Sequence, residues 1–136
     1  MISKISHVSI YVLDQDSAYD FYVNKLGFQV ATDAPMGPGA RWLTVTTPEQ
    51  PDIEITLMPI ISGMMFDDES AEQMKKLVKR GTFGYAVFQC NDIYATYEEL
   101  KAKGVEFTKA PKEEFYGIEA LFKDDSGNWF SLGQKP

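Results

Sequence analysis

The sequence is poor in the two residue types that most often build metal and redox sites. Its 136 residues include one cysteine, Cys90, and one histidine, His7. A lone cysteine excludes an internal disulfide and any zinc or iron–sulfur site with several cysteine ligands. A lone histidine cannot supply the two imidazoles that many catalytic metal sites take from one subunit. Metal chemistry in one chain would therefore depend on His7 and carboxylates.

Positive charge and long apolar runs are also scarce. Thirteen basic side chains stand against twenty acidic ones, a net charge of −7, which disfavours nucleic acid and anionic membrane surfaces as partners. The longest apolar stretches, residues 10–13 and 58–66, are far too short to span a bilayer. The N-terminus has no basic segment followed by a signal-peptide core, so a cytoplasmic location is expected.

What remains is an ordinary globular composition, with 44% hydrophobic and 24% charged residues, and a length that suits one domain. Periodicity predicts a first half with a strand over 4–12, a helix over 17–26, and strands over 28–32, 42–46 and 53–58. It predicts a second half with a strand over 85–90, a helix ending at Gly104, and strands over 105–108, 118–122 and 129–132. A further helix is predicted near 69–80.

The two halves repeat the same order of elements. The helix-ending glycines Gly27 and Gly104 lie 77 residues apart, as do Glu54 and Ser131. Such constant spacing indicates an internal repeat. We expect one domain over 1–136, with a first module over 1–58, a linker with its helix over 59–82, and a second module over 83–136.

Three phrases carry a resemblance to a known family: the segments 17–28 and 92–105, and the turn Asp-Asp-Ser-Gly-Asn at 124–128. They resemble the vicinal-oxygen-chelate superfamily, which includes glyoxalase I, bleomycin resistance proteins and extradiol dioxygenases. The resemblance covers essentially the whole chain. It implies an α+β fold of two βαβββ modules whose curled sheets enclose a cavity, within one chain or across a homodimer.

In metal-using members of that superfamily, the ligands lie on the first and last strand of each module. Carried onto this chain, these positions are His7 and Glu54 in the first module, and Tyr85 and Ser131 in the second. Neutral hydroxyls are weak ligands, so half of the quartet is missing. No cofactor is expected on this count. The alternative is one divalent metal ion held by His7, Glu54 and water, with Glu119 as a further candidate ligand.

His7 and Glu54 are also the candidate catalytic residues. His7 could act as a general base that the Glu54 carboxylate holds in one tautomer. The alternative is a hydrogen-bonded pair that lines a cavity whose metal function has been lost. Both hypotheses place the pair on the cavity side of the sheet.

A set of aromatic and polar side chains is predicted to bind a ligand in the cavity. Its members are Tyr11, Arg41, Trp42, Thr56, Tyr85, Gln89, Trp129 and Ser131. Arg41 is the candidate for gripping a carboxylate or phosphate. The alternatives are a surface position for Arg41 and a plain packing role for the others. The apolar stretch 59–66 is expected to pack on a second subunit or over the cavity mouth.

Three functions stay open at this point. The first, favoured by the broken quartet, is a small-molecule binding protein without metal. The second is a divergent metal-dependent lyase, isomerase or dioxygenase that uses His7 and Glu54. The third is an interaction protein with a residual cavity.

Overall fold

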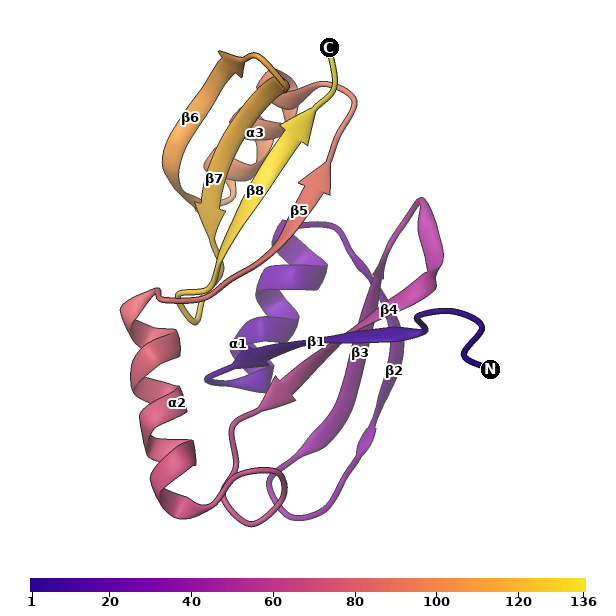
Figure 1. Ribbon diagram of the computed structural model, residues 1–136, viewed down its shortest axis with the longest axis vertical. Helices are drawn as coiled ribbons and strands as arrows, with labels where there is room; N and C mark the ends of the chain where they lie inside the picture. Colours follow the sequence, from indigo (N-terminus) through magenta and orange to yellow (C-terminus); the bar gives the residue numbers. More distant parts are fainter. The chain divides into compact units, whose positions relative to one another are not determined.

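The computed structural model describes all residues from 1 to 136 and contains two four-stranded sheets (Figure 1). The chain divides into two compact units, Met1–Lys75 and Lys76–Pro136. The helix α2 (Asp68–Arg80) carries the chain from the first unit into the second. No helix combines the length and the apolar character needed to cross a bilayer.

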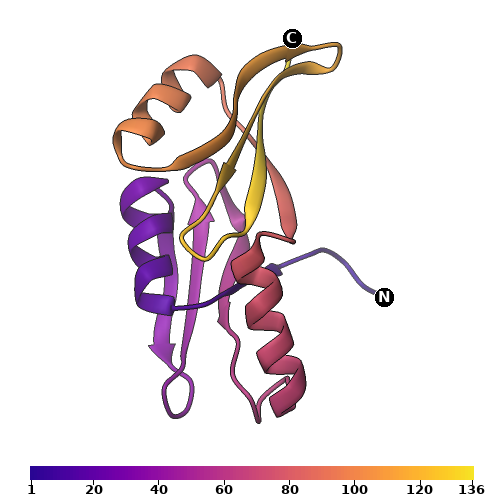
Figure 2. The ribbon, with the colours of Figure 1, turned by 90° about the vertical axis from the view of Figure 1, so that its left-hand side faces the viewer.

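The first unit contains a sheet in the order β1-β4-β3-β2. Its strands are β1 (His7–Val12), β2 (Gln29–Pro35), β3 (Arg41–Thr47) and β4 (Gln50–Pro59). β1 runs parallel to β4, and the other pairs are antiparallel. The helical segments α1 (Gln15–Tyr19) and η1 (Asp20–Lys25), a wider π-helical continuation, lie along one face of this sheet (Figure 2).

The core of the first unit lies between that sheet face and the helical segments. Asp14 caps α1 by accepting a hydrogen bond from the Ser17 amide at 2.8 Å. Because side chains alternate along a strand, every second residue faces the helix. Val12, Leu43, Leu57 and Tyr22 are accordingly fully buried.

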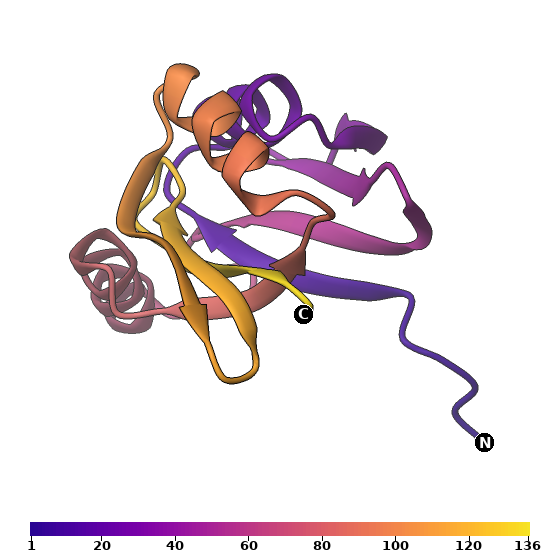
Figure 3. The ribbon, with the colours of Figure 1, turned by 90° about the horizontal axis from the view of Figure 1, so that it is seen from above.

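The second unit repeats this topology in the order β5-β8-β7-β6, again with the first and last strands parallel. Its strands are β5 (Gly84–Gln89), β6 (Glu106–Glu114), β7 (Gly117–Lys123) and β8 (Trp129–Gln134). The helix α3 (Ile93–Ala102) begins at its cap Asp92 and packs on one face of the sheet (Figure 3). Ile93, Phe122 and Phe130 form the centre of this core.

The predicted α+β fold with two βαβββ modules is confirmed, but several strands extend further than the sequence indicates. β2 continues to Pro35 and β6 to Glu114, whereas strands were predicted only over 28–32 and 105–108. Both are edge strands, which have a neighbouring strand on one side only. A proline is tolerated there because its missing N–H can face the side without a neighbour, so Pro35 and Pro111 do not end these strands. The two prolines and two glycines of residues 33–40 therefore do not exclude a strand over the first part of this segment.

The first helix and the fourth strand also have different bounds from those predicted. The helix was predicted over 17–26, but α1 begins at Gln15 and changes to the π-helical η1 at Asp20. β4 begins at Gln50, three residues before the predicted start at residue 53, because Thr47 pairs with Gln50 and closes the hairpin within two intervening residues.

Candidate functional site

The first unit brings the candidate catalytic pair together. The parallel register of β1 and β4 sets His7 opposite Glu54 and Ser9 opposite Thr56. His7 Nε2 lies 3.2 Å from Glu54 Oε2. The other carboxylate oxygen accepts a hydrogen bond from the Thr44 hydroxyl at 2.7 Å. The carboxylate can therefore orient the imidazole, as a general base requires, while its own position is fixed by Thr44.

Two more predicted residues, Trp42 and Thr56, share this sheet face. The Trp42 and His7 rings lie with their centroids 6.0 Å apart. Thr56 is 1% exposed, and its hydroxyl has no hydrogen-bond partner. A buried unpartnered hydroxyl costs about 1–3 kcal/mol. We call His7, Trp42, Thr44, Glu54 and Thr56 the first-module face.

Tyr11 lies at the end of β1, where the stretch 59–66 returns toward the sheet. Its ring meets Phe66 edge to face, with centroids 5.5 Å apart. Ile60 is buried, whereas Met64 and Met65 are exposed. The apolar stretch thus packs partly on its own module and leaves two methionines facing outward.

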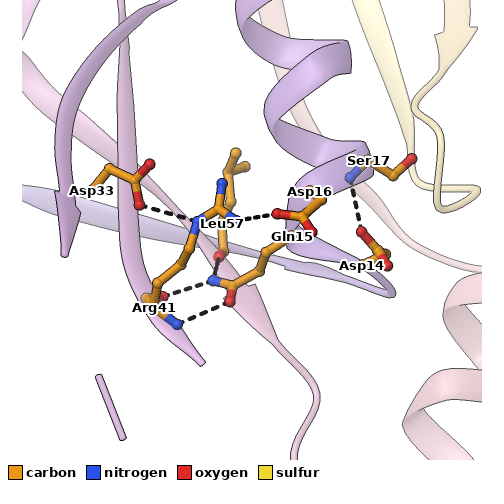
Figure 4. A network of polar contacts seen from close by, with 7 residues as sticks. All are labelled: Asp14, Gln15, Asp16, Ser17, Asp33, Arg41 and Leu57. Carbon is orange, nitrogen blue, oxygen red and sulfur yellow. Dashed lines mark hydrogen bonds and ion pairs between the residues drawn. The ribbon is translucent and has the colours of Figure 1, made fainter. Parts of the chain in front are cut away.

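Arg41 does not join the first-module face. It lies on the opposite side of β3, where its guanidinium contacts Asp16 of α1 and Asp33 of β2 (Figure 4). The guanidinium also lies over the Tyr19 ring. The Nε–Oδ1 distance to Asp33 is 3.0 Å. The hydrogen bond to Asp16 and the charges of both carboxylates raise the pKa of Arg41. The prediction that Arg41 grips a ligand acid in the cavity is corrected, because these two partners already satisfy its charge on the helix side.

Gln15, which the sequence did not single out as a candidate residue, makes several hydrogen bonds in the same region. Its side-chain amide donates to the carbonyls of Arg41 and Leu57 at 2.7 and 2.9 Å, and its side-chain carbonyl accepts from the Arg41 amide (Figure 4). Gln15 therefore ties α1 to β3 and β4, and Arg41 belongs to this structural network.

The second unit contains a cavity of about 260 Å³, the second-module pocket. Its walls come from β5, β7 and β8, from the β6–β7 turn and from the chain end. They consist of Val87, Phe88, Gln89, Tyr116, Ile118, Glu119, Ser131, Gly133, Gln134 and Lys135. Two predicted ligand-binding residues, Gln89 and Ser131, are among them.

Glu119 is the centre of a hydrogen-bond network at this pocket. One carboxylate oxygen accepts from Lys109 Nζ at 2.8 Å and from the Tyr116 hydroxyl at 2.9 Å. The other accepts from the Ser131 hydroxyl at 2.8 Å. These bonds, the one from Lys109 first, lower the pKa of Glu119, and those to Glu119 and Glu114 raise the pKa of Lys109. Glu119 is thus held as a carboxylate at neutral pH.

Tyr85 and Trp129 lie outside the walls of this pocket. The register of β5 shifts between Gly84 and Val87, so Val87, not Tyr85, stands opposite Ser131. Tyr85 instead stacks on buried Phe130, with centroids 6.4 Å apart. The predicted equivalence of Tyr85 with His7 is therefore corrected. Trp129 pairs with Gly84, and its indole occupies the space where a Cβ on that glycine would stand.

The residues present do not make a complete metal site in this chain. The first module offers His7 and Glu54, whereas the corresponding register positions in the second hold Val87 and Ser131. The Ser131 hydroxyl already donates to Glu119. No three His, Cys, Asp or Glu side chains converge as a metal-ligating group. Two ligands fall short of the three protein ligands typical of catalytic zinc and iron sites.

Two βαβββ modules, each with its first and last strands paired in parallel, define a glyoxalase-like class of protein. Comparison with family models agrees: the chain belongs to the Glyoxalase/Bleomycin resistance protein/Dioxygenase superfamily, whose model matches residues 4–132. The resemblance stated from the sequence is therefore confirmed.

Several relatives align along the full chain. YetH of Bacillus subtilis (strain 168) is 40% identical over 132 residues, which cover 97% of this chain and 98% of that protein. The crystal structure of UcmS2 has 43% identity and a TM-score of 0.91, covering 98% of both chains. TnmS3, an antibiotic binding protein from Streptomyces sp. CB03234, has 30% identity and a TM-score of 0.76, covering 99% of this chain and 98% of its own.

Proposed function

We propose that this protein binds and sequesters a small, largely apolar molecule in the second-module pocket. The observation that carries the proposal is the pocket itself, a half-open hollow whose accessible surface is mostly apolar. An apolar cavity of roughly 150 Å³ binds benzene. The half-open pocket of about 260 Å³ has room for a bicyclic aromatic body or a fragment of a larger ligand.

Two further findings support a binding role. TnmS3, which matches nearly the whole chain, is described as an antibiotic binding protein. The metal ligands of the superfamily are replaced in the second module by Val87 and Ser131, and a chain without a full ligand set is suited to holding a molecule rather than polarising it.

Thermal-shift screening tests the proposal with aromatic antibiotics, thiol conjugates and short acids as the panel. A ligand at 100 times its Kd stabilises the folded state by about 2.7 kcal/mol. Gly133 lines the pocket, and a Cβ there would meet no atom closer than 3.9 Å. We expect Gly133→Leu to fill the cavity and abolish the shift, and Gly133→Ala to reduce it. A panel without any stabiliser, or unchanged binding by Gly133→Leu, contradicts the proposal.

A second candidate function rests on the His7–Glu54 pair at 3.2 Å. In this hypothesis the protein is a lyase or isomerase in which His7 takes a proton from the substrate and Glu54 stabilises the imidazolium. A bound divalent ion is the narrower form of the same hypothesis. Metal analysis of protein purified without chelator tests the metal-dependent form. A stoichiometric ion that is lost in His7→Ala supports that form, and protein without a stoichiometric ion leaves only the metal-free form.

A further inference from the structure

Glu119 is the one carboxylate side chain among the walls of the second-module pocket. The hydrogen bonds that Glu119 accepts are distributed unequally over its two carboxylate oxygens. A carboxylate has about four acceptor positions. Two are taken on Oε1, by Lys109 and Tyr116, and one on Oε2, by Ser131. One acceptor position on Oε2 stays open, and the side chain is 22% exposed.

The hydroxyl and ammonium donors of this network are already engaged with carboxylates. The Tyr116 and Ser131 hydroxyls both donate to Glu119. The Lys109 ammonium is shared between Glu119 and Glu114, at 2.8 and 3.1 Å, and is not part of the pocket wall. A ligand therefore meets the carboxylate and not its counter-ion.

The remaining charge at the pocket is Lys135, which is exposed near the chain end. The Gln134 side-chain carbonyl accepts from the Ile93 amide at 2.7 Å. Apart from Lys135, the charge that faces the cavity is negative. The Glu119 carboxylate is fixed by three donors before any ligand arrives, so accepting a fourth requires no rearrangement of its own.

We infer that the pocket selects ligands with an apolar body that carries a hydrogen-bond donor, a hydroxyl or an amino group, directed at Glu119 Oε2. It discriminates against the same body with a carboxylate in that place, because two carboxylates repel each other in a partly desolvated site. The inference rests on the proposed function, since it names the ligand class of that pocket.

Three bicyclic probes separate the contribution of the hydrogen-bond donor from that of the charge in binding to the full chain. They are 2-naphthol, 2-methoxynaphthalene and 2-naphthoate. Their affinities are measured by calorimetry or by ligand fluorescence at neutral pH. A hydrogen bond to a charged group corresponds to roughly tenfold or more in affinity. We expect 2-naphthol to bind at least about tenfold more tightly than 2-methoxynaphthalene, and 2-naphthoate to bind more weakly than both.

Two variants test whether Glu119 is the cause. Glu119→Gln keeps a carbonyl acceptor but removes the charge, so it should bring 2-naphthoate up to the affinity of 2-methoxynaphthalene. Ser131→Ala frees an acceptor position while leaving the charge in place, so it should retain or increase the preference for 2-naphthol. Circular dichroism establishes that each variant is folded, and Ser131→Ala keeps the test decisive where Glu119→Gln fails to fold.

Each contrary result has a separate meaning. Equal binding of the three probes overturns the ligand class but leaves the proposed function standing. Tightest binding of 2-naphthoate, lost in Lys135→Ala, also overturns it and identifies an anion site at the chain end. No binding of any probe, in agreement with an empty thermal-shift screen, overturns the proposed function together with the inference.

Discussion

Thr44 and Thr56 occupy the same face of one sheet, but only one of their hydroxyls has a partner. Both are almost fully buried, and Thr44 donates to Glu54 whereas the Thr56 hydroxyl has no acceptor. Because valine has nearly the same shape as threonine, Thr44→Val should lower the free energy of unfolding by about 1 kcal/mol. Thr56→Val is the matched control and should be neutral or stabilising. Urea unfolding measures both, and a larger loss for Thr56→Val contradicts this account.

Glu119 links the pocket to the pH dependence of stability. Its folded-state pKa lies below the ordinary glutamate value of 4.5 because of the bonds from Lys109, Ser131 and Tyr116. A depressed pKa stabilises the folded state above that ordinary value, and the contribution is lost as the pH falls through the folded-state pKa. The contribution is modest, since the side chain is partly exposed.

The corresponding prediction compares the wild type with Glu119→Gln. The difference in their free energies of unfolding should be largest at neutral pH and should shrink as the pH falls below about 4.5. Denaturant titrations at several pH values measure it. Glu72→Gln, on α2, makes none of these contacts and is the matched control. A difference for Glu119→Gln that grows on acidification would contradict a lowered folded-state pKa of Glu119.

At the scale of elements, alternation and the repeat predicted much of what was found. The order of strands and helices followed from periodicity, whereas the pairing of His7 with Glu54 followed from the sheet order that the family resemblance implies. Alternation failed at β5, where the register shift after Gly84 turns Tyr85 toward Phe130. A bulge changes the face of a side chain without leaving a mark in the sequence.

Most of the hydrogen-bond network at the pocket could not be predicted from the sequence. Lys109, Tyr116 and Glu119 come from two strands and the turn between them, and their contacts depend on a register that contains two shifts. The sequence indicates Glu119 only as an additional candidate metal ligand. A charged residue between the apolar Ile118 and Ala120 of a strand was the available signal, since such a charge usually has a specific partner.

The turn between β7 and β8 provides a prediction at this scale. Asp124 accepts from the amides of Ser126, Gly127 and Asn128, each at 2.9 Å. Gly127 has a φ of +113°, and a Cβ there would lie 2.7 Å from the Val78 carbonyl oxygen at the end of α2. Gly127→Ala should therefore combine backbone strain with a steric clash and cost about 1–3 kcal/mol or more.

Gly63→Ala is the matched control for this turn. Gly63 also has a positive φ, +91°, but a Cβ there would meet nothing within 4 Å. It should show the backbone cost alone, about 1–2 kcal/mol. The excess loss for Gly127→Ala, measured by thermal or urea unfolding, isolates the close approach of the turn to α2. Equal losses for the two variants would remove the clash from the explanation.

At the scale of the whole molecule, the two modules repeat one topology but differ in what they carry. The first holds the His7–Glu54 pair, and the second holds the pocket and the Glu119 network. Buried positions such as Val12 and Phe130 maintain the shared scaffold, whereas side chains on the opposite sheet faces have diverged. Function in this superfamily therefore has to be argued from each face separately, because the fold is common to many activities.

The predicted homodimer is tested at the same scale. Met64 and Met65 are 47% and 65% exposed in the apolar stretch 59–66, and neighbouring exposed apolar side chains are typical of interfaces. We predict a solution mass of twice the 15.3 kDa of one chain, measured by size-exclusion chromatography with light scattering at micromolar concentration. Replacing both methionines by glutamate should yield monomers, because each buried charge would lack a partner.

Phe115→Glu, at a residue that is 98% exposed outside this stretch, should leave the dimer intact. Dissociation by Phe115→Glu but not by the methionine variant would move the interface to the β6–β7 turn, and a monomeric wild type would remove it altogether.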